Sequence, residues 1–216
     1  MDPKAIFVHI PKCGGTWVRK QLIDYPILMG GHAIPSNDHY LPKFGFIRNP
    51  WTWYVSWYNF SQYGSENFPT YKDISPLIAL KESCTFGAFI LQKCAPTIGY
   101  KNQLLKEYLK NLNNDGMEFI LLQTTQHWIK SNKSYLEHLY DLYLFNCIMI
   151  GRLENIKADL EEMSTLIGLP IKINNTANIN IGKKVDYRTY YTDETAQLVF
   201  DTHQRIITKH GYTFDK

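Results

Sequence analysis

Residues 4–17 read KAIFVHIPKCGGTW, and this stretch decides the fold. It opens with a short apolar run that contains β-branched residues, which is typical of a buried strand. Gly14 and Gly15 break the run, and residues 16–25 then carry apolar side chains at roughly helical spacing, with Thr16 as the expected helix cap. The pattern predicts a strand, a glycine-rich loop and a helix.

The loop has the groups that an anion needs. A glycine-rich turn that leads into a helix directs several backbone N–H groups to one point, where the helix dipole adds partial positive charge. Lys12 supplies a full charge and Thr16 a hydroxyl donor. These groups suit the oxygens of phosphate or sulfate. A tight turn with a solvated lysine is the alternative that the loop alone leaves open.

Further along the chain, apolar runs alternate with helical patterns. Strands are expected at 43–49 and 142–151, with Pro50 in the first turn of the helix that follows the earlier one. Such alternation predicts a parallel sheet covered on both faces, which binds ligands outside the carboxyl ends of its strands. An asparagine-rich loop is expected at 174–184, and helices are expected over 51–63, 73–94, 100–112, 134–140, 152–169 and 193–209.

Composition narrows the class of protein. A chain of 216 residues with 44% hydrophobic and 20% charged residues suits one domain with a sizeable core. A net charge of +3 argues against attachment to nucleic acid by a general basic field. The four cysteines are scattered without a C-x-x-C pair, so neither zinc spacing nor a disulfide framework is present. The chain shows no signal peptide or membrane span, and we expect a soluble, cytoplasmic protein without a membrane partner.

Two known phosphate chemistries compete for the loop. The nucleoside triphosphatase P-loop places its lysine after the glycines, whereas Lys12 precedes them, so this class is disfavoured. A cysteine phosphatase uses C-x5-R, and Cys13 to Arg19 spell that pattern. A cysteine near a helix N-terminus and a lysine is expected to have a depressed pKa and to be nucleophilic. The phosphatase hypothesis therefore stays open.

A second motif, FGFIRNPWTWYVSWYNF over 44–60, suggests another anion site. It places Arg48 at the end of a strand and Ser56 two turns into the next helix. A guanidinium and a hydroxyl in these places can grip one phosphate from two sides. A surface arginine and a helix serine are the plain alternative for this motif in isolation.

The two motifs together resemble the paired signature of sulfotransferases that use PAPS (3′-phosphoadenosine-5′-phosphosulfate). The sequence HIPKCGGTW over 9–17, followed by FIRNP and VSWY within 46–58, is most similar to the carbohydrate and heparan-type branch, whose first loop commonly reads HIPKTGGT. Residues 150–169 and 191–214 resemble later segments of that family. The similarity runs through most of the chain and is weakest over 62–116.

The resemblance implies a site for the donor. Lys12 and the amides of Gly14, Gly15 and Thr16 would hold the 5′-phosphosulfate, and Arg48 with Ser56 would hold the 3′-phosphate. It also places Cys13 and Trp17 in the donor loop, and it makes Trp128 in QTTQHWIK a candidate for stacking on adenine. Arg152 would face the donor from the end of the strand at 142–151.

Sulfuryl transfer to a hydroxyl needs a base for the acceptor proton and positive charge at the leaving phosphate. Lys12 would stabilise the bridging oxygen, and no metal is required if lysine, arginine and amides neutralise the donor. His32 in MGGHAIP is the leading base, because family members often carry Gly-His between the two motifs. His39 is the next choice, and Glu154 is a carboxylate alternative that more plausibly orients the site. His9 is expected to be a core or supporting group.

The chain also departs from the family pattern. Cys13 stands where the family often has threonine, and Thr52 and Trp53 replace its usual aspartate and arginine. These changes affect the acceptor more than the donor. The aromatic residues of the helix at 51–63 are expected mainly to pack, with a stacking wall for a sugar or aromatic acceptor as the alternative.

Pattern and resemblance together predict an α/β fold: a P-loop-like three-layer sandwich with a central parallel sheet flanked by helices, in a single domain over 1–216. The expected activity is in-line transfer from PAPS to a small-molecule or glycan hydroxyl, with no nucleic-acid partner. A Cys13-dependent phosphatase and a nucleotide- or glycan-binding module without catalysis remain the alternatives.

Overall fold

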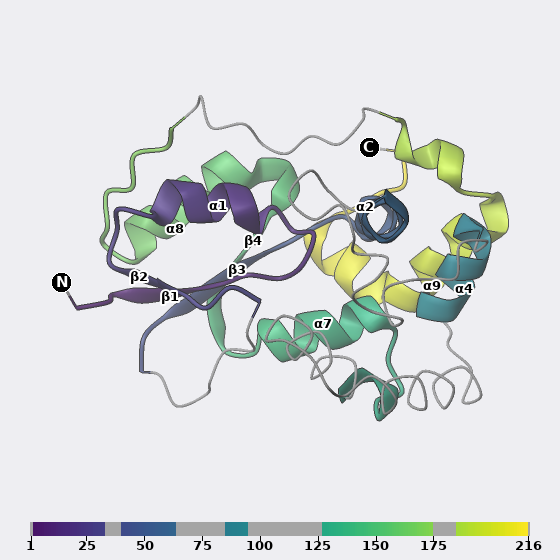
Figure 1. Cartoon of the computed structure of the whole chain (residues 1–216), viewed down its shortest axis with the longest axis horizontal. Coiled ribbons are helices and arrows are strands. Elements are labelled where there is room, and N and C mark those ends of the chain that lie inside the picture. Colours follow the sequence, from purple (N-terminus) through teal and green to yellow (C-terminus); the bar gives the residue numbers. More distant parts are fainter. Residues whose placement is uncertain (1, 33–39, 64–84, 95–126, 175–184, 216) are drawn as a thin grey trace. The chain divides into compact units, whose positions relative to one another are not determined.

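A computed structural model describes residues 2–32, 40–63, 85–94, 127–174 and 185–215 (Figure 1). The chain divides into two compact units, the first formed by Met1–Asn49 and Leu139–Val185 and the second by Pro50–His138 and Asp186–Lys216. Whether they act as one domain stays a prediction. The helix predicted at 100–112 and the residues 73–84 of another lie outside the described residues, as does nearly all of the asparagine-rich loop.

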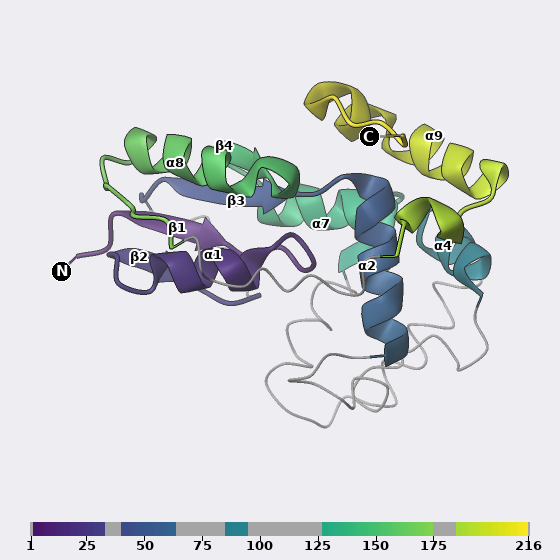
Figure 2. The same ribbon diagram turned by 90° about the horizontal axis from the view of Figure 1, so that it is seen from above.

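The first unit contains a parallel sheet. Its strands are β1 (Ala5–Val8), β2 (Ile27–Met29), β3 (Lys43–Ile47) and β4 (Cys147–Arg152). Their order is β2-β1-β3-β4, and every pair is parallel (Figure 2). The predicted mixed α/β class with a parallel central sheet is therefore confirmed. This order puts the carboxyl ends of β1 and β3 side by side, where the two sequence motifs begin.

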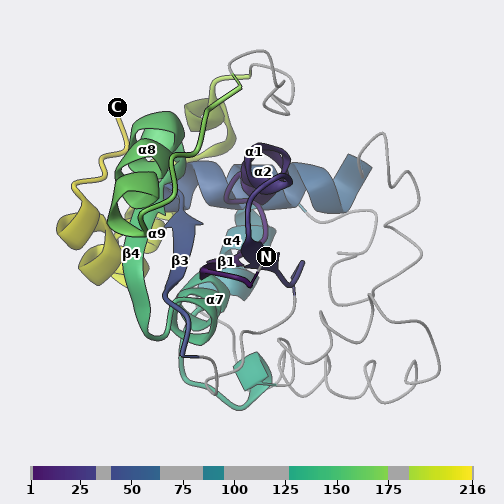
Figure 3. The ribbon, with the colours of Figure 1, turned by 90° about the vertical axis from the view of Figure 1, so that its left-hand side faces the viewer.

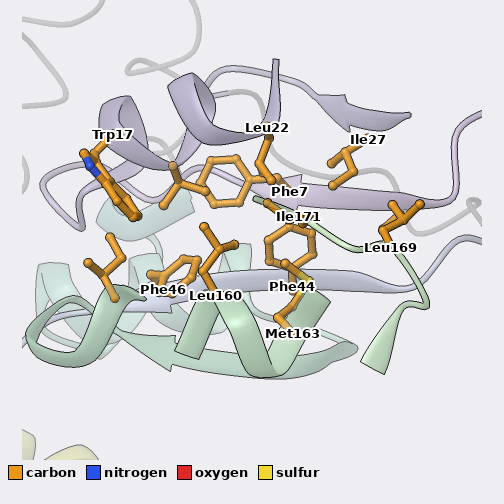
Figure 4. Close-up of a cluster of buried hydrophobic side chains, with 13 residues drawn as sticks. Phe7, Trp17, Leu22, Ile27, Phe44, Phe46, Leu160, Met163, Leu169 and Ile171 are labelled. Carbon is orange, nitrogen blue, oxygen red and sulfur yellow. The ribbon is translucent and has the colours of Figure 1, made fainter. Parts of the chain in front are cut away.

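One face of the sheet carries the main hydrophobic core of the first unit. Helices α1 (Gly15–Leu22) and α8 (Ile156–Leu166) both pack on it (Figure 4). Side chains alternate along a strand, so β1 and β3 send every second residue to this face. The cluster includes Phe7, Phe44 and Phe46 from the strands, Trp17, Val18 and Leu22 from α1, and Ile156, Leu160 and Met163 from α8.

The opposite face of the sheet meets the segment that precedes β4. Helix α7 (Tyr135–Tyr143) crosses from the second unit into the first, and its later part lies on this side of the strands (Figure 3). A Cβ added to Gly45 would lie 2.9 Å from Leu144 Cδ2 and 3.3 Å from the Val8 carbonyl oxygen. A bare glycine in β3 thus lets Leu144 pack close to the sheet.

Several elements differ from the sequence expectations, and the strand expected at 43–49 already ends at Ile47. Thr16 is not the cap of α1: the N-cap is Gly14, at φ 79, without a side-chain capping bond, because a left-handed glycine turns the chain directly into the helix. The strand expected at 142–151 begins only at Cys147, since the apolar run before it completes α7. The helix expected at 152–169 begins as a 3-10 turn, Leu153–Asn155. The strand β2 was not expected.

The second unit is helical in the residues described. It contains α2 (Pro50–Tyr63), α4 (Phe86–Cys94), a 3-10 turn at Tyr187–Tyr190 and α9 (Asp193–His210), with α9 packed against both α2 and α4. The predicted final helix is confirmed. Thr192 and Thr195 form a capping box at its start, and Gly211 at φ 65 closes it. Across the described residues, no helix combines the length and the apolar character that crossing a bilayer requires.

Candidate functional site

The loop after β1 has an unusual backbone conformation that leaves the first amides of α1 available to an anion. Lys12 at φ 65 and Gly14 at φ 79 both lie in the left-handed region, which is costly for a lysine. The Trp17 N–H donates to the Gly14 carbonyl at 3.0 Å, the first bond of the helix. The amides of Gly15 and Thr16 precede that bond, so they have no intrahelical acceptor. These amides can serve an anion at the N-terminus of α1.

Gly15 also leaves room for a histidine. A Cβ at this position would lie 1.8 Å from His9 Cδ2 and 2.1 Å from His9 Nε2, so the imidazole occupies the space that a side chain would need. His9 follows β1 directly and is 7% exposed. Burial and the neighbouring His32 and Arg19 lower the pKa of His9 to about 3, so the ring is neutral at physiological pH. The expectation that His9 is a core or supporting group is consistent with this position.

Arg48 reaches the same loop from the neighbouring strand. Its Nη1 donates to the Lys12 carbonyl oxygen at 3.3 Å. The residue is held at both backbone atoms: its N–H donates to the Tyr140 hydroxyl at 3.1 Å, and that hydroxyl donates to the Arg48 carbonyl at 3.0 Å. The next amide, of Asn49, donates to Glu154 Oε1 at 2.8 Å. Glu154 thus fixes the end of β3, the orienting role expected for it.

Burial of the loop shifts the pKa values of its ionisable side chains. Burial and the Arg48 guanidinium lower the pKa of Lys12 from its ordinary 10.5 to about 8. Burial raises the pKa of Cys13 to about 12 and outweighs the positive charge of Arg48 and Lys12. The two cations repel each other, and an anion that binds beside them would relieve that repulsion. At neutral pH the loop offers positive charge and a protonated thiol.

His32 lies beside the loop, in the first unit. Its ring is 4.0 Å from the ring of His9, and its Nδ1 is 3.2 Å from the His9 carbonyl oxygen. The Tyr143 hydroxyl donates to the His32 carbonyl at 2.6 Å, which ties this turn to α7. Burial lowers the pKa of His32, and the positive charges of Arg19 and Lys12 lower it further against the bond to His9. The ring is therefore neutral at physiological pH and able to accept a proton.

Three expected donor residues either belong to the other unit or have a buried side chain. Ser56 and Trp128 belong to the second unit, and Trp128 is fully buried with its Nε1 donating to the Lys133 carbonyl at 3.0 Å. The Trp17 side chain lies in the hydrophobic core of the first unit (Figure 4). The structure thus shows no open indole face at either tryptophan, and their contacts with a donor stay predictions. His39 lies outside the described residues.

Arg152 stands at the end of β4, paired in register with Ile47 of β3. Its backbone N–H donates to Asp159 Oδ2 at 2.6 Å, which fixes the strand end against the first turn of α8. It therefore lies at the same carboxyl edge of the sheet as the loop, as the sequence predicts. Its contact with a donor stays a prediction.

The aromatic helix α2 mainly packs. Trp51, Trp53, Tyr54 and Trp57 are all buried, and Trp53 stacks on Trp57 with ring centroids 5.3 Å apart. Trp51 Nε1 donates to the Ala196 carbonyl of α9 at 3.0 Å. The packing role expected for most of these side chains is confirmed. If α2 provides a stacking wall for an acceptor, only its half-buried aromatic side chains are available for it.

Sequence reasoning missed Tyr140 and Tyr143. The Tyr140 hydroxyl donates to the carbonyl of Arg48, and the Tyr143 hydroxyl donates to the carbonyl of His32. Each partner lies about a hundred residues away in the chain, so no local pattern could mark the pair. A helix with tyrosines three apart, on one face, was the only available signal.

Comparison with protein-family models, with curated proteins and with solved structures finds no match for this chain.

Proposed function

We propose that the chain is a PAPS-dependent sulfotransferase that acts on a hydroxyl acceptor, with a carbohydrate as the proposed acceptor class. One observation carries the proposal: the Arg48 guanidinium meets the Lys12 carbonyl at 3.3 Å. The two motifs whose pairing resembles that family therefore converge on one loop, at the carboxyl edge of a parallel sheet. The proposed donor carries a phosphate at each of two ends, and Lys12 after β1 and Arg48 after the neighbouring β3 would each bind one of them.

The proposed chemistry uses groups that the first unit brings together. The acceptor oxygen forms a bond to sulfur while the bond from sulfur to the bridging phosphate oxygen breaks, and PAP leaves. His32 takes the proton of the acceptor hydroxyl. Lys12 and the amides of Gly15 and Thr16 stabilise the negative charge that grows on the leaving phosphate. Arg48, with Ser56 as its proposed partner, holds the 3′-phosphate.

The finer architecture belongs to the same proposal. A strand, a glycine-rich loop and a helix N-terminus at the carboxyl edge of a parallel sheet form the core of a P-loop-like three-layer sandwich. In the first unit, α1 and α8 cover one face of the sheet and Leu144 packs on the other. This arrangement supports the sandwich as the best description of the fold.

The Cys13-dependent phosphatase is the second candidate, and the site disfavours it. A nucleophilic cysteine must be a thiolate that a substrate can reach. Cys13 is 2% exposed, and burial raises its pKa to about 12. Cys13→Ala should leave sulfuryl transfer largely intact and abolish a phosphatase, so assays of both activities on this variant separate the two candidates.

The first test is calorimetric binding of PAP, compared with ATP and with inorganic phosphate, all without magnesium. We expect PAP to bind most tightly, because it alone presents a 5′- and a 3′-phosphate. Arg48→Ala should weaken PAP by at least tenfold, since a charge-assisted contact contributes about 1.5–3 kcal/mol. Binding of inorganic phosphate, which uses only the first loop, should change less.

A matched variant controls for damage to the fold. Arg188 is also paired, through its Nη2 to Asp186 Oδ2 at 2.6 Å, but it lies on the surface of the second unit. Arg188→Ala should leave the affinity for PAP unchanged. A well-folded protein that does not bind PAP would refute the proposal, and PAP binding without cleavage of PAPS would favour a binding module.

A further inference from the structure

The bond between His32 and His9 determines which nitrogen of His32 carries a hydrogen. Its partner is a backbone carbonyl oxygen, which can only accept. The His32 Nδ1, at 3.2 Å, must therefore be the donor. In the neutral ring the other nitrogen, Nε2, then has a free lone pair. This is the less common tautomer of histidine in water, so the structure imposes it.

The His9 ring keeps His32 in this position. The two rings are 4.0 Å apart at an interplanar angle of 35°. His9 also stacks on Phe7, with ring centroids 5.9 Å apart, and its edge fills the space above Gly15. The His9 ring is thus wedged between a strand residue and the anion loop. His32 rests on a surface that cannot move without displacing one of them.

The backbone of His32 is fixed as well. The buried Tyr143 donates to its carbonyl at 2.6 Å, so the turn that carries the ring is tied to α7. The groups that act on the ring are His9 from the end of β1, Lys12 from the loop and Arg19 from α1, while Tyr143 of α7 binds the backbone carbonyl. No carboxylate is among the described groups around the ring. Burial and positive charge therefore oppose protonation of His32, and the bond to the His9 carbonyl favours it.

We propose that His9 is a positioning residue for the base: its carbonyl selects the Nδ1–H tautomer of His32, and its ring aims the free Nε2 at the acceptor hydroxyl. Gly15 contributes to the same arrangement in two ways. Its amide can donate to the anion, and its lack of a side chain leaves room for the His9 ring. The catalytic half of this inference rests on the proposed function, whereas the tautomer rests on geometry alone.

The direct test is NMR of protein labelled with ¹⁵N in its seven histidines. Long-range proton–nitrogen correlations show which ring nitrogen is protonated, and His32→Gln assigns the His32 signals. We expect the wild-type protein at pH 7.5 to show His32 fully as the Nδ1–H form. A signal of the Nε2–H form or of a mixture would overturn the inference, whatever the activity.

The His9 ring is tested by two variants. His9→Ala should release the His32 ring, which would then show a mixture of tautomers and a titration midpoint closer to 6.5. His9→Phe keeps a flat ring and should preserve the Nδ1–H form. Gly15→Ala should reproduce the mixture by pushing His9 out of place. An unchanged His32 spectrum in a folded His9→Ala protein would show that the ring has no positioning role.

Activity supplies the last readout, with cleavage of PAPS by water as the probe reaction. His9→Ala should lower kcat by about tenfold to a hundredfold, within the range of a misplaced general base, and leave the affinity for PAP within twofold. His9→Phe should stay within about threefold of the wild type. His203→Phe, which alters a buried histidine of the second unit, serves as the control for loss of stability.

These readouts separate the two proposals. Loss of cleavage in His32→Gln together with an Nε2–H wild-type signal would overturn the positioning role and leave the sulfotransferase standing. An Nδ1–H signal in a protein that neither binds PAP nor cleaves PAPS would refute the sulfotransferase and the catalytic role of His9, and would leave only the tautomer.

Discussion

At the scale of single residues, we expect the charge of Lys12 to set how strongly the loop holds the proposed anion. Its pKa is lowered to about 8, so the free protein loses this charge as the pH rises through 8. A bound phosphate favours the charged form and raises the pKa. We therefore expect the affinity for PAP to fall by about tenfold between pH 7 and pH 9, measured by calorimetry.

Variants of Lys12 and its neighbour check the assignment of this titration. Lys12→Arg keeps a charge throughout the range and should flatten the pH profile, whereas Lys12→Met should bind weakly at every pH. Cys13→Ala should keep the wild-type slope, because burial raises the pKa of Cys13 to about 12, outside the range. A slope that survives in Lys12→Met would assign the titration to another group.

At the scale of elements, one buried hydrogen bond joins α2 to α9. The Tyr54 hydroxyl lies 2.9 Å from His203 Nε2, and both side chains are fully buried. His203 interrupts the helical dihedrals of α9, at φ −113 and ψ 18. Tyr54→Phe would leave the imidazole nitrogen without this partner, and we expect a loss of about 1–3 kcal/mol in the free energy of unfolding, measured in urea.

A tyrosine of the same unit provides the comparison. The Tyr190 hydroxyl donates to Asn59 Oδ1 at 3.2 Å, and both residues are only half-buried. Water can replace that partner, so Tyr190→Phe should cost less than about 1 kcal/mol. Equal losses in the free energy of unfolding in the two variants would mean that burial does not strengthen the contribution of the Tyr54–His203 bond to stability.

The elements that the sequence predicted are those with strong local patterns. The apolar run before Gly14 fixed β1, and Pro50 marked the first turn of α2 because proline suits that place. The three-residue strand β2, Ile27–Met29, was missed, since it is too short to show a period and depends on pairing with β1. The start of β4 was misplaced because apolar residues fill both a helix end and a strand.

At the scale of the whole molecule, the site divides into a local and a long-range part. Lys12, Arg48 and His32 could be predicted because each sits in a short motif with a chemical reason. Tyr140 and Tyr143 could not, because their roles arise only when α7 packs beside strand ends that are distant in sequence. Motifs therefore indicate the groups that are proposed to bind a ligand, and only the fold reveals the groups that hold those residues in place.

Each unit also carries a buried neutral histidine, His9 in the first and His203 in the second, and together they predict acid sensitivity. Burial lowers the pKa of each to about 3, against an ordinary value near 6.5. Below pH 6.5 the unfolded chain binds a proton at each ring, and the folded chain does so only near pH 3. The free energy of unfolding should therefore fall as the pH drops through this window, by about 1.4 kcal/mol per pH unit for each histidine.

Urea unfolding at pH 7, 6, 5 and 4 measures this dependence, and single variants divide it. His203→Phe should reduce the pH dependence of the free energy of unfolding by the contribution of this histidine of the second unit. The variant should also be less stable at every pH, because Tyr54 loses its partner. His9→Phe should do the same for the first unit. A slope that neither buried variant reduces would show that acid acts through the carboxylates alone, and that the two imidazoles are protonated in the folded protein.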